Sequence, residues 1–191
     1  MLASSTHPRW FRVASRNLAG LLSDHLHCER KAAENALSMV RRYPGDGDIA
    51  LALGRLAHEE TSHVIQVAEL IADRGLTPRP DSPNRYARAL FAEVRTTEPE
   101  HKVDALLVAA LIEARSHERL RLLENGFATQ GDERLAAFYR MLANAEERHA
   151  EIFCDIAAAA IGKGAMDVRL SELALREAEI LAAQPFSSRV H

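Results

Sequence analysis

One pattern of metal-binding residue types occurs twice in this chain. In each copy a single glutamate is followed, about thirty residues later, by Glu-x-x-His. The first copy is Glu29, Glu60 and His63, and the second is Glu113, Glu146 and His149. Carboxylate and imidazole are ligands that iron and manganese accept from proteins. Residues three apart share one face of a helix, so each Glu-x-x-His can present both side chains to one ion. The doubled pattern therefore predicts a dinuclear metal centre.

A third Glu-x-x-His, from Glu98 to His101, is interpreted differently. Pro99 lies inside it. Proline is unfavourable in a helix interior and common at a helix start. This copy is therefore expected to begin a helix and to bind no metal.

The elements that position the ligands are predicted from apolar residues that recur every three or four positions. They indicate helices at about 12–43, 48–74, 85–94, 99–127, 133–161 and 167–183. Turn-forming residues are expected to end these helices at residues 44–47, Gly75, residues 130–132 and residues 162–164. Asp48 is the expected N-cap of the second helix. Three prolines between positions 77 and 84 exclude a regular helix there.

The predicted glutamate ligands lie on the apolar stripes of the four long helices. A buried carboxylate is costly unless its charge is compensated, and two metal cations would compensate it. Four helices that supply two glutamates and two Glu-x-x-His pairs are typical of ferritin-like carboxylate centres. We expect an all-α, ferritin-like four-helix bundle with a crossover connection and an additional C-terminal helix, forming a single domain over residues 1–191.

Composition limits the cellular location and the cofactors expected for the protein. The 191 residues carry a formal net charge of −3. No apolar run is long enough for a transmembrane helix, and no secretory signal is recognised. The two cysteines, Cys28 and Cys154, do not form a disulfide framework, so a reduced cytoplasmic location is expected. No flavin or nicotinamide fingerprint is present, so electrons for redox chemistry must come from a separate protein.

Other polar residues near the predicted ligands have alternative interpretations. His117 is expected to be a packed histidine more readily than a ligand, and Tyr139 a core residue more readily than a wall of an oxygen pocket. Asp24 and Glu59 are candidates to hold the ring N–H of a ligand histidine, or they belong to a solvated helix face.

Several strings in the sequence resemble the MiaE family. They are residues 22–33 (LSDHLHCERKAA), Tyr43-Pro44, residues 111–119 (LIEARSHER) and residues 145–149 (AEERH). The resemblance extends over about residues 10–182. It implies a non-haem di-iron monooxygenase that hydroxylates the isopentenyl group of 2-methylthio-N6-isopentenyladenosine beside the tRNA anticodon. Carried over by position, the iron ligands are Glu29, Glu60, His63, Glu113, Glu146 and His149.

The resemblance also implies co-substrates and partners. Two iron ions, O2 and an external electron donor, such as a reductase with a ferredoxin, would serve the reaction, and tRNA would be the substrate. Arginine contacts to phosphate and stacking on aromatic or guanidinium planes are usual in recognition of such loops. The candidates near the crossover are Arg79, Arg85, Tyr86, Arg88 and Arg95, although each also fits a solvated connection.

Two alternatives remain open from the sequence. One is a ferritin-like oxidase or peroxidase that acts on a small molecule or on iron itself. The other is a metal-free helical interaction protein, which would tolerate loss of all six ligands. The sequence does not define the oligomeric state.

Overall fold

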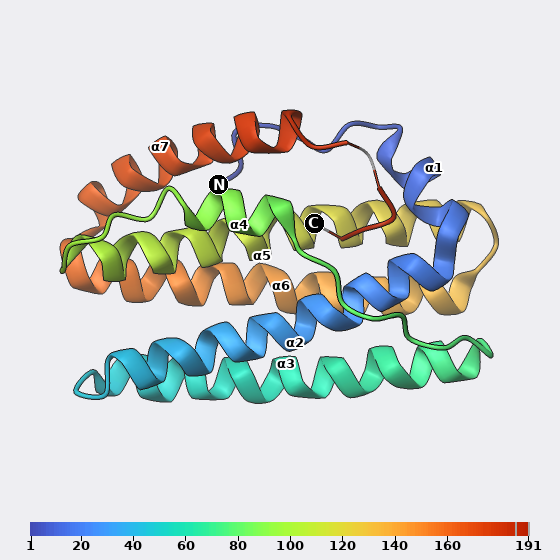
Figure 1. Ribbon diagram of the computed structural model, residues 1–191, viewed down its shortest axis with the longest axis horizontal. Helices are drawn as coiled ribbons and strands as arrows, with labels where there is room; N and C mark the ends of the chain where they lie inside the picture. The colour runs from blue at the N-terminus through green and yellow to red at the C-terminus, as the bar shows by residue number, and fades with distance from the viewer. Residues whose placement is uncertain (186, 191) are drawn as a thin grey trace. The chain divides into compact units, whose positions relative to one another are not determined.

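The computed structural model describes residues 1–185 and 187–190, and the regular structure in these residues is entirely helical (Figure 1). In chain order the elements are α1 (Trp10–Ala14), the short 3-10 helix η1 (Ser15–Asn17), α2 (Leu18–Arg42), α3 (Gly47–Asp73), α4 (Arg85–Phe91), α5 (Glu100–Thr129), α6 (Glu133–Ile161) and α7 (Lys163–Ala182). The predicted all-α class is confirmed. Among the described residues, none of the helices combines the length and apolar character needed to cross a bilayer.

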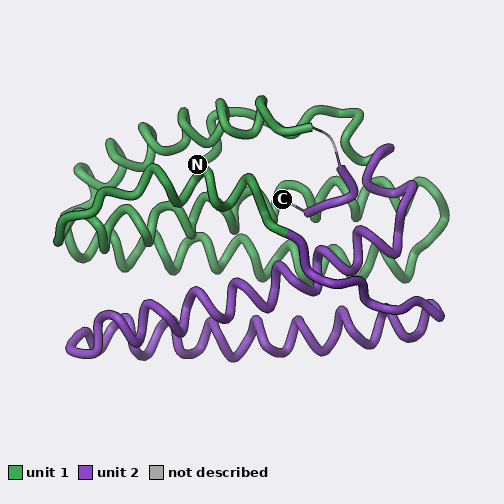
Figure 2. Tube along the Cα trace, viewed as in Figure 1, with its two compact units in different colours: residues 1–11, 83–186, 191 green, residues 12–82, 187–190 purple. Residues whose placement is uncertain are grey.

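The described residues divide into two compact units (Figure 2). Unit 1 contains residues 1–11 and 83–185, and unit 2 contains residues 12–82 and 187–190. Each unit is built on one pair of long neighbouring helices, α5 with α6 in unit 1 and α2 with α3 in unit 2. Each pair carries one copy of the Glu and Glu-x-x-His pattern. A single domain over residues 1–191 stays a prediction.

The first helical segment of unit 2 is interrupted, where the sequence predicted one helix over residues 12–43. Residues 15–17 form η1, and Asn17 then leaves the helical region with φ −131° and ψ 73°. Its side chain accepts a hydrogen bond from the Gly20 N–H at 3.1 Å and so caps the new helix α2. A Cβ at Gly20 would lie 2.4 Å from the Asn17 amide nitrogen, so the glycine makes room for this cap.

The start of α3 differs by two residues from the sequence prediction. Asp46, rather than Asp48, is the N-cap, and its carboxylate accepts from the Ile49 N–H at 3.1 Å. Asp48 lies in the first turn of the helix instead. At the other end, Gly75 adopts φ +63°, a conformation that favours glycine, and the helix stops as predicted.

Unit 1 is organised around α5 and α6, which the turn at residues 130–132 joins. Gly131 takes φ +81° in this turn, and Asp132 caps α6 by accepting from the Leu135 N–H at 3.1 Å. Pro99 immediately precedes α5, as the sequence predicted for the third Glu-x-x-His. Phe11 from the N-terminal segment packs edge-on against Phe127 of α5, with ring centroids 5.4 Å apart. A Cβ at Gly126 would come within 2.2 Å of the Phe11 ring.

Helices α4 and α7 pack in the same unit, α4 against α5 and α7, and α7 also against α5 and α6. α7 begins at Lys163, four residues earlier than predicted. Gly162, at φ +82°, ends α6 and starts α7, so the reversal between the two helices needs one residue rather than the whole 162–164 turn.

A buried ionic cluster joins α4, α5, α7 and the N-terminal segment of unit 1. Fully buried Arg115 donates through Nε and one terminal nitrogen to both oxygens of Glu177, at 2.9 Å each. The Tyr86 hydroxyl donates to the same carboxylate at 2.8 Å. Arg115 also donates to the Ser4 carbonyl at 2.9 Å and to Glu118, which in turn accepts from the Thr6 N–H at 2.8 Å. Four segments of the chain therefore meet at this buried cluster.

Candidate metal centre

Unit 2 brings its three predicted ligands together. Glu29 comes from α2, and Glu60 and His63 come from α3. The Nδ1 atom of His63 lies 3.3 Å from Glu29 Oε2 and 3.4 Å from Glu60 Oε2. Each of the three residues is buried and offers a ligand atom within 4.8 Å of the others. The close packing of α2 against α3 thus turns two positions far apart in the sequence into one donor cluster.

His25, which was not among the predicted ligands, also belongs to this cluster. It is fully buried, and its Nε2 lies 2.6 Å from Glu29 Oε1. The two residues are four apart on α2, a spacing that brings side chains together on a helix. This spacing was the sequence signal that could have indicated the contact.

Electrostatics in the cluster favours a cation among its carboxylates. Burial raises the pKa of Glu29, but contacts with His25 and His63 outweigh it and hold the pKa well below its ordinary value. Burial lowers the pKa of His63, yet Glu29 and Glu60 together raise it to about 9. Two buried carboxylates thus require positive charge, which a proton on His63 supplies in the absence of metal.

The donor set fits a first-row transition metal. Two carboxylates and one imidazole combine oxygen and nitrogen ligands, the combination used for non-haem iron. A bound cation would take over the charge compensation that His63 otherwise provides, and its ligands would then be neutral imidazole and ionised carboxylate. The buried residues of unit 2 therefore fit the metal that the sequence pattern predicted.

Unit 1 presents the second copy of the pattern on its own helix pair. Glu113 is a residue of α5, and Glu146 and His149 are residues of α6. All three are buried, and His149 is fully buried. Glu147, the neighbour of Glu146, is exposed. The helical period thus separates an inward glutamate from an outward one at adjacent positions.

The other candidates occupy ordinary structural positions. The ring of His117 forms a hydrogen bond through Nδ1 to the Ala143 carbonyl at 2.8 Å, which confirms the packed histidine. Tyr139 is fully buried and its ring stacks against Phe127, as expected of a core tyrosine. Asp24 accepts from the Val190 N–H at 2.8 Å and from the Cys28 thiol, so it holds a distant segment of unit 2.

The residues predicted to contact nucleic acid differ in their exposure and in their side-chain partners. Arg79, Arg85 and Arg88 are exposed. Arg95 is exposed too, but it binds both oxygens of Asp104, at 2.8 Å each. Tyr86 is buried at 4% exposure with its hydroxyl on Glu177, so its ring is not available as a stacking surface.

Residues 1–191 match the family described as tRNA-(MS[2]IO[6]A)-hydroxylase (MiaE). The chain belongs to the MiaE family. It is therefore related to enzymes named as hydroxylases, and the predicted resemblance is confirmed.

Two curated MiaE relatives carry the name tRNA 2-(methylsulfanyl)-N(6)-isopentenyladenosine(37) hydroxylase. The protein from Pseudomonas putida is 40% identical over 156 residues, which cover 82% of this chain and 74% of the relative. The protein from Salmonella typhimurium is 32% identical, and the match covers 74% of this chain and 68% of the relative.

A solved structure resembles the whole chain. It is described as protein 43 with aldehyde deformylating oxygenase activity from Synechococcus. It is 36% identical, with a TM-score of 0.92 over 100% of this chain and 94% of that chain. The fold of this chain is thus ferritin-like, as its sequence predicted.

Proposed function

We propose that this protein hydroxylates the isopentenyl group of 2-methylthio-N6-isopentenyladenosine next to the anticodon of tRNA. The observation that carries the proposal is the buried Glu29, Glu60 and His63 cluster in a chain of the MiaE family. The family supplies the substrate class, and the cluster supplies ligands for a metal that can activate oxygen.

The cofactor would be a pair of iron ions bound by the six residues of the doubled pattern. These are Glu29, Glu60, His63, Glu113, Glu146 and His149. Support comes from their ligand types, from their equivalent spacing in the two helix pairs and from the burial of all six. When bound, the metal pair would supply the activation of O2 that C–H hydroxylation requires.

The residues of the chain prepare the ligands and keep water away from them. The His25 contact holds one oxygen of Glu29, so the other oxygen can turn to a metal. The packing of α2 on α3 fixes Glu29 relative to Glu60 and His63 before any metal arrives. Apolar neighbours such as Leu22, Leu56 and Val67 are buried on the same two helices and limit the access of water.

The reaction also requires partners outside the chain. Hydroxylation by O2 consumes two electrons from outside, so we expect a reductase, with a ferredoxin-like donor as the simplest form. We expect the protein to act in the cytoplasm, where a tRNA substrate is found. Arg79, Arg85 and Arg88 are the exposed arginines that we propose for phosphate contacts, while Arg95 is committed to Asp104.

The activity test uses the full-length protein with ferrous iron, a chemical reductant and tRNA that carries the prenylated nucleoside. Mass spectrometry of the digested nucleosides should show a gain of one oxygen atom, and 18O2 should label it. Equal yield without oxygen, or oxygen taken from water, would contradict a monooxygenase.

A matched pair of variants tests the site. Glu146→Ala removes a buried predicted ligand, and Glu147→Ala removes its exposed neighbour. We expect Glu146→Ala to lower the iron bound per chain and to abolish hydroxylation, with helical circular dichroism retained. Glu147→Ala should match the parent in both. Full iron content in Glu146→Ala would remove that residue from the ligand set.

A second candidate function is oxygenation of a small molecule. It is favoured by the likeness to the Synechococcus protein with aldehyde deformylating oxygenase activity. Assay of the iron-loaded protein with an aldehyde under the same conditions separates the two. Turnover of the aldehyde without any change in tRNA nucleosides would replace our proposal with this one.

A further inference from the structure

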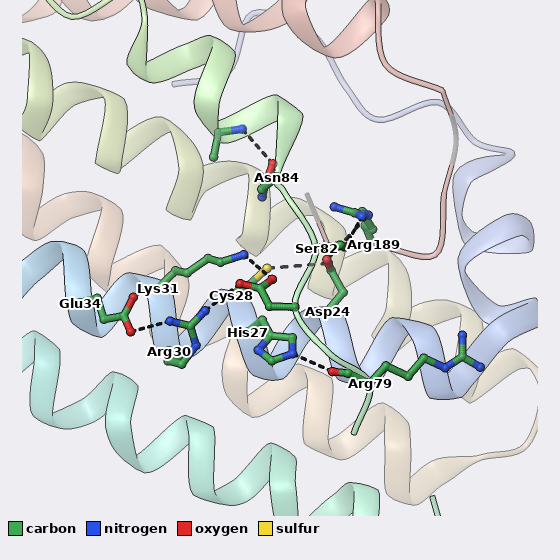
Figure 3. Close-up of polar contacts among 12 residues, drawn as sticks. Asp24, His27, Cys28, Arg30, Lys31, Glu34, Arg79, Ser82, Asn84 and Arg189 are labelled. Carbon is green, nitrogen blue, oxygen red and sulfur yellow. Dashed lines mark hydrogen bonds and ion pairs between the residues drawn. The ribbon is translucent and has the colours of Figure 1, made fainter. Parts of the chain in front are cut away.

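Residues 77–82, here named the strap, form an irregular segment that is fixed along α2 in unit 2 (Figure 3). The Arg79 N–H donates to Ser23 Oγ at 3.0 Å, and His27 Nε2 donates to the Arg79 carbonyl at 2.9 Å. Further along, Asp81 accepts from Arg30 at 2.8 Å and from Lys31 at 2.7 Å. The strap is therefore held at successive turns of one helix.

The sequence of the strap makes its backbone stiff. Arg79 lies between Pro78 and Pro80. Each proline fixes its own φ, and Pro80 also restricts the residue before it to extended conformations. Both backbone polar groups of Arg79 are hydrogen-bonded to α2. The position of the Arg79 Cα is thus fixed by two hydrogen bonds to α2 and by the prolines on either side.

The side chain of Arg79, in contrast, is exposed. Figure 3 shows it extending away from its anchored backbone. The cations Arg30 and Lys31 are balanced by the anions Asp81 and Glu34. Arg189 forms its contacts with Ser82 and Asp24. Arg79 therefore contributes a positive charge that these neighbouring ion pairs do not neutralise.

The anchors of Arg79 lie on a different face of α2 from the predicted metal ligand Glu29. His27 precedes Glu29 by two residues, and side chains two apart on a helix do not face each other. The other anchor, Ser23, lies one turn before His27 on the face that holds the strap. A phosphate at Arg79 would therefore belong to the RNA backbone outside the reacting nucleotide.

We propose that the strap is part of the tRNA-docking surface and that Arg79 binds a backbone phosphate of the anticodon stem-loop. This inference rests on the proposed function and deepens it. Guanidinium binds phosphate through two parallel hydrogen bonds. A backbone that is already fixed loses little entropy when the contact forms, so the stiff strap strengthens the interaction.

The first test measures binding of an anticodon stem-loop RNA that carries the prenylated adenosine, over a range of salt concentrations. Arg79→Ala should weaken binding roughly ten-fold, as expected for a charged hydrogen bond. It should also lower the slope of log affinity against log salt by roughly 0.7–0.9. Arg79→Lys should retain the slope with part of the affinity. Parental binding by Arg79→Ala at every salt concentration would overturn the proposal.

The control is Arg55→Ala, which removes an exposed arginine from α3 of the same unit. It changes the net charge by the same amount and should leave the affinity and salt slope unchanged. An equal loss in both variants would mean that general charge, and not the strap, binds the RNA. Iron content should equal the parental value in both variants.

A second variant tests the stiffness of the strap. Pro80→Gly leaves Arg79 in place but frees the backbone beside it, and should weaken binding roughly two- to five-fold. In the double variant with Arg79→Ala the proline change should have no further effect, because the two act through one contact. Additive losses would contradict a role for the fixed backbone.

The outcome distinguishes this inference from the proposed function. If the parent binds and hydroxylates tRNA while Arg79→Ala does so equally well, only the role of the strap fails. If the parent neither binds the stem-loop nor modifies tRNA, the proposed function itself fails.

Discussion

Asp104 shows how a single residue of unit 1 is kept ionised inside the protein. Its side chain is fully buried and accepts hydrogen bonds from Arg95 and Arg169. It accepts from the Arg95 backbone N–H as well, at 3.0 Å. Burial raises the pKa of Asp104, but the two guanidinium groups outweigh it and hold the pKa well below its ordinary value. The carboxylate therefore joins the start of α5 to the segment after α4 and to α7.

We predict that Asp104→Asn lowers the free energy of unfolding at pH 7 by about 2 kcal/mol, because two arginines lose their anion. A lowered carboxyl pKa gives stability that is present above the unfolded pKa of about 3.9 and is lost as pH falls below it. The difference in the free energy of unfolding between parent and variant, measured with urea, should thus have its full size at pH 7 and pH 5 and become smaller below pH 4. A constant difference over this range would mean that the charge of Asp104 is not responsible.

The predicted metal residues could be identified from sequence because their signal is local. Glu-x-x-His on an apolar stripe needs only the helical period to be recognised. The contact of Arg115 with Glu177 could not be predicted in this way, since the two residues are separated by 62 positions and belong to different helices. Likewise, Tyr86 resembled a surface aromatic in its arginine-rich segment until the partner on α7 was known.

At the scale of helices, the boundaries were less predictable than the helices themselves. Asp46 and Asp48 both precede the apolar residues of α3, and sequence preference does not choose between them. The choice depends on which carboxylate reaches a free backbone N–H, and in this protein Asp46 reaches Ile49. The break between α1 and α2 depended in the same way on the geometry of Asn17 and Gly20.

The two aspartates give a direct test of the helix start. Asp46→Ala should lower the free energy of unfolding by about 1 kcal/mol, the usual cost of losing an N-cap. Asp48→Ala should cost less, because this residue contributes only through its charge near the helix N-terminus. Thermal unfolding of both variants checks the order, and a larger loss in Asp48→Ala would contradict the assigned cap.

The packing of α7 depends on the Glu177 carboxylate. Glu177→Ala would leave the Arg115 charge buried without its main anion and remove the acceptor of the Tyr86 hydroxyl. We expect a loss of about 3–5 kcal/mol in the free energy of unfolding, typical of breaking a buried ion pair.

Glu179→Ala is the control for this variant, since Glu179 is an exposed residue of the same helix that pairs with exposed Arg176. Exposed pairs contribute little, so a change below about 1 kcal/mol is expected. Chemical denaturation measures both variants. Similar losses would mean that the helix itself, and not the buried carboxylate, determines the stability.

For the whole molecule, charge distribution decides how a polyanion can bind. The net charge is −3, so attraction to tRNA must come from local groups of arginines and not from the total charge. Arg85 and Arg88 are exposed on the short helix α4 of unit 1, and they are part of our proposed tRNA surface.

Replacement of both Arg85 and Arg88 by alanine should weaken tRNA binding and make it less dependent on salt. Each lost phosphate contact lowers the salt slope by roughly 0.7–0.9. Filter binding at several salt concentrations measures the effect, and iron content should remain at the parental value. Unchanged binding would contradict this surface and would favour the exposed Arg9, Arg12 and Arg16 near the start of the chain as the site of tRNA binding.

The contact between Phe11 and Gly126 has a consequence for the history of the family. Since any Cβ at position 126 would come within 2.2 Å of the Phe11 ring, a larger residue at position 126 requires that ring to move or to be replaced by a smaller side chain. A relative with alanine or serine at position 126 should carry a smaller residue than phenylalanine at position 11. Lineages that keep the aromatic ring should keep the glycine. The two sites should therefore vary together, although Phe11 lies in α1 near the start of the chain and Gly126 lies near the end of α5.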